Sequence, residues 1–196
     1  LYQGELVAAR AQFAQGKALF SLPQHAARSV RGVHDPGVMC HAFDMLACWL
    51  MGEREAAQAG ATHLRDMVPV LAPYDAAFLW CADALLAVLN GDAATACESA
   101  RRGLAIAEEQ AFNAWEMMGA VLHGWGLAMQ GPPQPGIDQM QRGLEAWCAT
   151  GAHNLRPLFQ ALQADAWLAA GQPQRALQAA EAGLLGASTG ERCWAP

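Results

Sequence analysis

The chain has 196 residues, of which 54% are hydrophobic and 15% are charged, and its formal net charge is −6. An acidic chain without a basic cluster is poorly suited to the nucleic-acid backbone, so we expect no nucleic-acid partner. No apolar run approaches the roughly 18 residues that span a bilayer, and no signal peptide is recognisable, so we expect no membrane partner and a cytoplasmic location.

The predicted elements are helices joined by short turns. A first helix is predicted over residues 5–20, and residues 1–20 are interpreted as a partial repeat unit. Residues 21–36 are predicted to be an irregular linker, at whose end Asp35 and Pro36 favour a helix start, because aspartate caps helices and proline suits the first helical position. Four helical hairpins are predicted next, over residues 37–67, 74–109, 111–149 and 154–185, and residues 191–196 are interpreted as the start of a further unit.

Glycines recur at a nearly fixed spacing between these helices. Each of four turn glycines ends one apolar helical pattern just before another begins, and the intervals are 39, 40 and 40 residues: Gly52, Gly91, Gly131 and Gly171. A small residue follows each glycine five positions later: Ala57, Ala96, Gly136 and Ala176. A constant period with small residues at fixed offsets is typical of stacked helical hairpins. The sequence therefore predicts an all-α fold, a right-handed α-solenoid that forms a single array over residues 1–196.

The offsets of these small residues resemble the tetratricopeptide repeat (TPR), although the period here is longer than that family's roughly 34 residues. Several strings look like the TPR-like region of large bacterial signalling ATPases of the AAA or STAND type, which are linked to cyclase or regulator domains: Asp35-Pro36-Gly37-Val38, Gly124-Trp125-Gly126-Leu127-Ala128 and Ala170-Gly171-Gln172-Pro173. The resemblance covers about residues 35–194. It implies TPR-like hairpins with a sensor or scaffold role, while the chemistry resides in domains outside this chain.

One polar column stands out when the units are aligned on their turn glycines. Eight positions before the glycines stand Asp44, Asp83, His123 and Gln163. Residues at neighbouring helical offsets are His41, Trp80, Glu116 and Arg156. Because equivalent positions of stacked repeats lie side by side, we expect these eight side chains to share one groove that binds a partner or ligand. The alternative is an ordinary solvent-exposed face, and a separate apolar stripe contains Met39, Phe43, Leu46 and Leu50.

Other residues with reactive side chains show no recognisable site. The six cysteines lie mostly in apolar helical patterns without a CxxC pair, so we predict free thiols, no metal and no cofactor. Four histidines lie near predicted helix ends or loops and have no partner visible in the sequence: His25, His34, His63 and His153. The only Gly-Lys pair, Gly16-Lys17, precedes Ala18 instead of Ser or Thr, so it is not a phosphate-binding loop.

The absence of a nucleophile, metal or phosphate motif argues against an enzyme. The leading hypothesis is a non-catalytic interaction or scaffold module of a signalling protein. It binds a protein or peptide segment in the groove that is lined by the first helix of each hairpin. That segment could belong to another domain of the parent protein, and a homodimer through exposed end faces is a further option. The alternative function is a small-molecule sensor domain of a multidomain regulator.

Overall fold

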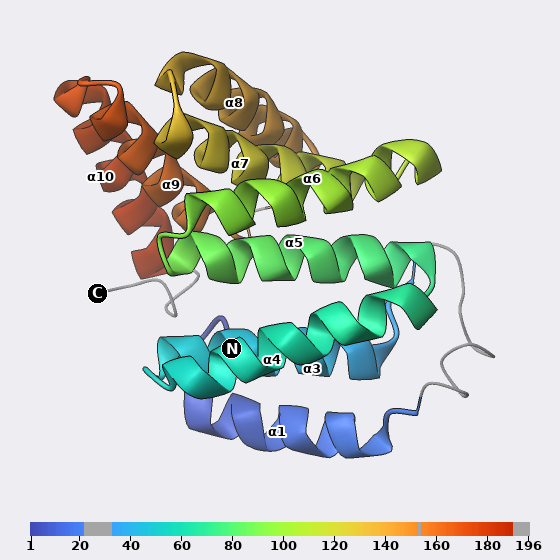
Figure 1. Cartoon of the computed structure of the whole chain (residues 1–196). Helices are drawn as coiled ribbons and strands as arrows, with labels where there is room; N and C mark the ends of the chain where they lie inside the picture. Colours follow the sequence, from blue (N-terminus) through green and yellow to red (C-terminus); the bar gives the residue numbers. More distant parts are fainter. Residues whose placement is uncertain (22–32, 153, 190–196) are drawn as a thin grey trace.

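The fold is described from a computed structural model, which describes residues 1–21, 33–152 and 154–189. Within these ranges all regular structure is helical, which confirms the predicted all-α class (Figure 1). The α-helices are α1 (Leu6–Leu19), α3 (Pro36–Leu50), α4 (Arg54–Met67), α5 (Pro73–Leu89), α6 (Ala93–Gln110), α7 (Asn113–Gln130), α8 (Pro133–Ala149), α9 (Arg156–Ala169) and α10 (Pro173–Thr189). A short 3₁₀ helix, η1 (Val68–Val70), follows α4.

The helix starts follow from local hydrogen bonding. The Asp35 carboxylate accepts a hydrogen bond of 2.8 Å from the backbone N–H of Gly37, and Pro36 occupies the first helical position, as the sequence predicts. Asp92 caps α6 in the same way by accepting from the N–H of Thr95 at 3.0 Å. In both cases a side-chain oxygen satisfies a backbone donor that has no partner inside the helix.

The turn glycines separate successive helices, and three of them share one conformation. Gly52, Gly91 and Gly171 have φ values of +80°, +73° and +68°, and each turn is closed by two backbone bonds back to the preceding helix. This left-handed C-cap geometry favours glycine. Gly131 differs, with an extended φ of −157°, because the following Pro132 disfavours other backbone conformations.

Ala111 makes the same kind of turn without being a glycine. It ends α6 with a φ of +56°, and the N–H of the following Phe112 bonds the carbonyl of Ala107 at 2.8 Å. A Cβ atom in this region is strained by roughly 1 kcal/mol. Ala111→Gly should therefore raise the free energy of unfolding by about 1 kcal/mol and the melting temperature by about 3 °C. The matched control is Ala105→Gly in the exposed middle of α6, which should lower the free energy of unfolding by about 1 kcal/mol. A loss of stability in both variants would contradict the left-handed conformation of Ala111.

The helices form two layers. α3, α5, α7 and α9 each contact the next member of this series, and we call them the first-helix layer. α4, α6, α8 and α10 pack against the preceding first-layer helix, and α1 packs against α3 (Figure 1). A single cluster of buried apolar side chains runs from Val38 in α3 to Ala176 in α10. α1 differs from the other long helices because none of its residues is fully buried.

Glycines inside α7 and α8 allow these two helices to touch through their backbones. A Cβ atom on Gly124 would lie 2.6 Å from the carbonyl oxygen of Gly136, and one on Gly136 would lie 2.6 Å from the backbone nitrogen of Ala128. A Cβ on Gly126 would meet α6 instead, 3.0 Å from the carbonyl of Ala93. The close approach of three consecutive helices explains why glycine occupies helical positions that it otherwise destabilises.

The predicted hairpin bounds lie within about two residues of the observed helix ends, except that α10 continues to Thr189, beyond the predicted end at residue 185. α8 begins at Pro133, directly after the turn at Gly131 and Pro132. Most of the expected linker over 21–36, namely residues 22–32, lies outside the described residues, as does the expected further unit over 191–196.

Candidate functional site

The polar column predicted from the sequence does not line one common groove. Asp44 and His41 line a cavity between α1, α3 and α4, whereas Asp83 and Trp80 line a different groove between α4 and α6. The register along each helix is as expected, since His41 lies beside Asp44 and Trp80 beside Asp83. The expectation of one shared groove is corrected because these side chains bond different neighbouring helices.

Asp44 holds α1 against the rest of the molecule. Its carboxylate accepts from Nε of Arg10 at 3.3 Å and pairs with Lys17, while Arg10 also donates to Glu53 at 2.7 Å. These charged groups border a cavity of about 310 Å³. Since α1 contributes no fully buried side chain, its attachment depends strongly on these ion pairs and on partly buried aromatic rings.

His41 and His63 both line this cavity, and their ring centroids are 4.8 Å apart. Burial, together with the nearby His63 and Lys17, lowers the pKa of His41 from 6.5 to about 4, whereas Asp44 opposes the change. The folded protein therefore resists a positive charge on this ring.

Acidification should consequently weaken the fold through His41. Between pH 6.5 and about 4, the unfolded chain takes up a proton at this residue that the folded chain does not. The free energy of unfolding therefore decreases as the pH is lowered. His41→Gln removes this linkage, and its urea midpoint should fall less than that of the wild type between pH 7 and pH 4.5. Parallel declines of the two midpoints would contradict the assignment.

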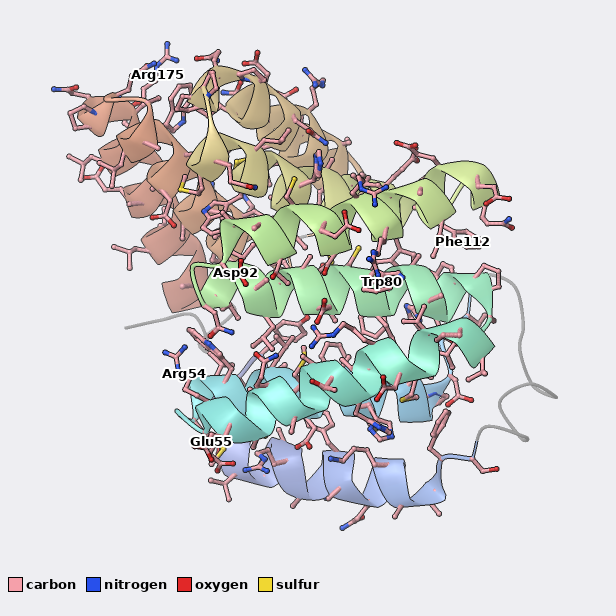
Figure 2. All side chains as sticks on the ribbon, viewed as in Figure 1. Arg54, Glu55, Trp80, Asp92, Phe112 and Arg175 are labelled. Atoms are coloured by element: carbon pink, nitrogen blue, oxygen red, sulfur yellow. The ribbon has the colours of Figure 1, made fainter. Side chains whose placement is uncertain are left out.

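Asp83 is a buried carboxylate, with 2% of its surface exposed, at the floor of the second groove. It accepts from Oγ of Ser99 at 2.6 Å and from Arg65 at 2.7 Å. Burial raises the pKa of the Asp83 carboxyl, while the bonds from Ser99 and Arg65 act in the opposite direction. The groove above it measures about 610 Å³ and is lined by Trp80 of α5 (Figure 2). The guanidinium of Arg102 lies 4.8 Å from the ring centre of Trp80.

The remaining members of the predicted site lie in other places. His123 is half-buried on α7, and its Nδ1 lies 3.1 Å from Oε1 of Gln139 on α8. Gln163 is half-buried on α9, Glu116 is half-buried in the first turn of α7, and Arg156 is exposed at the first position of α9. Asp44, Asp83 and His123 thus bond side chains of α1, α4, α6 and α8, so this column connects the first-helix layer to helices outside it.

The opposite, apolar face of the first-helix layer forms a more enclosed site of about 330 Å³, which we call the aromatic cavity. Three successive helices of this layer line it, namely α3, α5 and α7, together with residues from α8 and the connecting segments. The lining residues are Tyr2, His34, Met39, Phe43, Leu46, Phe78, Ala82, Leu85, Trp115, Met118, Trp147, Asn154 and Leu155.

The apolar stripe of the sequence analysis indicates part of the wall of this cavity, since Met39, Phe43 and Leu46 all line it. Met39, Phe78 and Met118 each stand thirteen residues before a turn glycine, and all three line the cavity. Phe43 and Ala82 repeat in the same way at nine residues. The alignment that yields the polar column therefore also yields the cavity wall, but apolar residues at helical spacing are equally typical of a core.

His34 brings a polar contact to the wall of the aromatic cavity. Its Nδ1 lies 2.8 Å from Oδ1 of Asp75, a carboxylate in the first turn of α5 that is only 2% exposed. The imidazole also contacts three aromatic rings, with centroid distances of 4.6 Å to Tyr74, 4.7 Å to Phe78 and 5.0 Å to Trp115. No partner for His34 is recognisable in the sequence, because Asp75 lies 41 residues away along the chain.

Other sequence expectations have separate outcomes. His63 packs against His41, whereas His25 and His153 lie outside the described residues. Five cysteines are free thiols, namely Cys40, Cys48, Cys81, Cys97 and Cys148, and Cys193 lies outside the described residues. Within the described ranges, no cluster of three or more His, Cys, Asp or Glu side chains is arranged to hold a metal. No helix in these ranges combines the length and apolarity that crossing a membrane requires.

Comparisons with protein-family models, curated proteins and solved structures give no match to this chain. The functional argument therefore depends on the geometry of the described residues alone. Among the sites described above, the aromatic cavity has the composition of a typical ligand pocket, which is mostly apolar and aromatic with few polar groups.

Proposed function

We propose that this chain is a right-handed, TPR-like α-solenoid with a period of about 40 residues that binds a ligand without transforming it. The equal intervals between turn glycines and the repeated left-handed turns at Gly52, Gly91 and Gly171 support the repeat assignment. The layered packing of alternate helices also supports it. As in the resemblance given by the sequence, the array is proposed to serve as the sensor or scaffold part of a signalling protein.

The ligand that the geometry favours is a small apolar molecule held in the aromatic cavity. The observation that supports this choice is the convergence of α3, α5 and α7 on one partly enclosed space of about 330 Å³. Pockets for small molecules start at about this volume and are lined mainly by apolar and aromatic side chains. Because three repeats contribute to the wall, an occupied cavity would fix their relative positions, which suits a sensor domain of a multidomain regulator.

Thermal unfolding with a small hydrocarbon tests this proposal. 4-Ethyltoluene at tenfold above its dissociation constant should raise the melting temperature by about 4 °C, because a ligand that binds only the folded state stabilises it. Ala82→Met places a longer side chain in the cavity wall and should remove this response. The matched control is Ala94→Met, which changes an exposed alanine that lines the groove above Asp83.

Far-ultraviolet circular dichroism should give the same helicity for both variants and the wild type. The proposal fails if 4-ethyltoluene does not bind the wild type by calorimetry. It also fails if Ala82→Met retains full helicity and responds to the hydrocarbon as strongly as Ala94→Met does.

A second candidate function is the binding of a protein segment, and one observation favours it. α10 exposes three leucines, Leu177, Leu184 and Leu185, whose exposed fractions are 60%, 54% and 70%. Adjacent exposed leucines are more typical of a protein contact than of a surface in water. If they mediate self-association, Leu184→Asp should lower the mass measured by analytical ultracentrifugation to that of the monomer, and an unchanged mass would exclude a homodimer through this surface.

A further inference from the structure

Two polar arrangements lie at the wall of the aromatic cavity among the described residues: Nε1 of Trp147 donates to the carbonyl of Asn154 at 2.9 Å, and His34 pairs with Asp75. Asp75 is almost completely buried, and its Oδ1 lies 2.8 Å from Nδ1 of His34. Its Oδ2 accepts from the backbone N–H of Asp35 at 3.4 Å. A buried carboxylate is costly unless it is hydrogen-bonded, so this pair fixes the position of the His34 ring.

The bond to Asp75 also decides what His34 can offer to a ligand. An ionised carboxylate only accepts hydrogen bonds, so Nδ1 of His34 carries the proton and donates it to Asp75. In the neutral imidazole the other nitrogen, Nε2, then presents a lone pair. Within the described part of the chain, the hydrogen bond of the ring is at Nδ1, which leaves Nε2 as the acceptor of a residue that lines the cavity.

The surroundings of this acceptor are aromatic. The rings of Tyr74, Phe78 and Trp115 lie within 5.0 Å of the His34 ring, centroid to centroid. The indole Nε1 of Trp115 is shielded, with less than 1 Å² exposed, so Trp115 presents ring carbons to the cavity. A ligand that suits these walls is therefore a flat apolar body with a single hydrogen-bond donor.

We propose that the aromatic cavity binds a small phenol or aryl alcohol, whose hydroxyl donates a hydrogen bond to Nε2 of His34. Asp75 acts as a positioning residue that holds the imidazole in the accepting tautomer, and the aromatic rings enclose the apolar body of the ligand. This inference rests on the proposed function of the cavity, since it names the class of ligand that the same site takes.

Three para-substituted ethylbenzenes separate the hydrogen bond from apolar burial; the hydroxyl and methyl probes are nearly isosteric, and the methoxy probe is one carbon larger. 4-Ethylphenol donates and accepts hydrogen bonds, 4-ethylanisole only accepts them, and 4-ethyltoluene does neither. Titration calorimetry of the wild-type chain should give an affinity for the phenol about fivefold to tenfold higher than for either other probe, because a net neutral hydrogen bond is worth about that ratio.

Replacing the acceptor should abolish this preference. His34→Phe keeps an aromatic ring but has no lone pair, so the ratio between phenol and toluene affinities should fall to one or below, because the buried hydroxyl then has no acceptor. Comparing ratios cancels the different costs of removing each probe from water. Asp75→Asn should lower the ratio partly, since its amide no longer enforces the accepting tautomer.

The outcomes distinguish this inference from the proposed function. If 4-ethyltoluene and 4-ethylphenol bind the wild type equally well, the hydroxyl inference is wrong but the cavity remains a ligand site. If 4-ethylanisole binds as tightly as 4-ethylphenol, His34 does not act as the acceptor. If none of the three probes binds, the proposed function and the inference both fail. The wild-type comparison needs no variant, so it remains decisive even if His34→Phe does not fold.

Discussion

Replacing Gly136 with alanine should lower the free energy of unfolding by about 3 kcal/mol or more, because the new methyl group has no space. Its Cβ would collide with the carbonyl oxygen of Gly124 and would lie 2.6 Å from the backbone nitrogen of Ala128. Both obstacles are backbone atoms of α7, so no side-chain rotation can relieve the contact. Chemical denaturation followed by circular dichroism should detect the loss as a lower denaturant midpoint.

The matched control for this change is Gly131→Ala, five residues earlier in the chain. A Cβ at Gly131 would meet nothing within 4 Å, and its extended φ of −157° suits any residue. The free energy of unfolding should therefore stay the same or rise by up to about 0.5 kcal/mol, since alanine restricts the unfolded chain more than glycine does. Similar losses in Gly136→Ala and Gly131→Ala would show that α7 and α8 do not touch as described.

Arg65→Met should be the second most damaging change, with a loss of about 3 kcal/mol at pH 7. It retains the apolar stem but removes the guanidinium that donates to Asp83 at 2.7 Å, which leaves a buried carboxylate without its ion-pair partner. The control, Arg101→Met, removes an exposed arginine that pairs with Glu98, so it should change stability by less than about 0.5 kcal/mol.

The pH dependence of Arg65→Met provides a second readout. Burial already raises the pKa of Asp83 in the wild type, and loss of Arg65 should raise it further. A carboxyl whose pKa is higher in the folded state destabilises the fold when it ionises, so the deficit of the variant should shrink as pH falls from 7 to 4. Asp83→Asn in the Arg65→Met background should recover much of the stability at pH 7. A deficit that stays constant with pH and is not relieved by Asp83→Asn would show that the loss of stability does not arise from the unpaired Asp83 carboxylate.

The positions of the helices could be predicted from the sequence because local chemistry determines them. The Asp35 cap, the following Pro36 and the glycines at the turns act within a few residues of each other, and the structure has each where the sequence predicts it. The conformation of Gly131 could also have been predicted, since the next residue is proline.

The candidate site was predicted only in part, because a helical period identifies a face without identifying its neighbour. Asp83 and Phe78 both lie on α5, five residues apart, and both belong to columns that repeat along the chain. Asp83 meets Arg65 and Ser99 on the adjacent helices α4 and α6, whereas Phe78 faces the aromatic cavity. From the sequence, the polar column was the natural choice for a binding surface, and its members instead join helices to each other.

The sequence by itself therefore determined the helical class, the helix ends and the residues that repeat on each face. Only the tertiary structure decided that Asp83 is buried in an ion pair, and that His34 pairs with Asp75 while its imidazole contacts three aromatic side chains. The physical reason is distance along the chain: caps and turns form between residues a few positions apart. Contacts between helices join residues tens of positions apart, and they depend on how each helix is rotated against its neighbours.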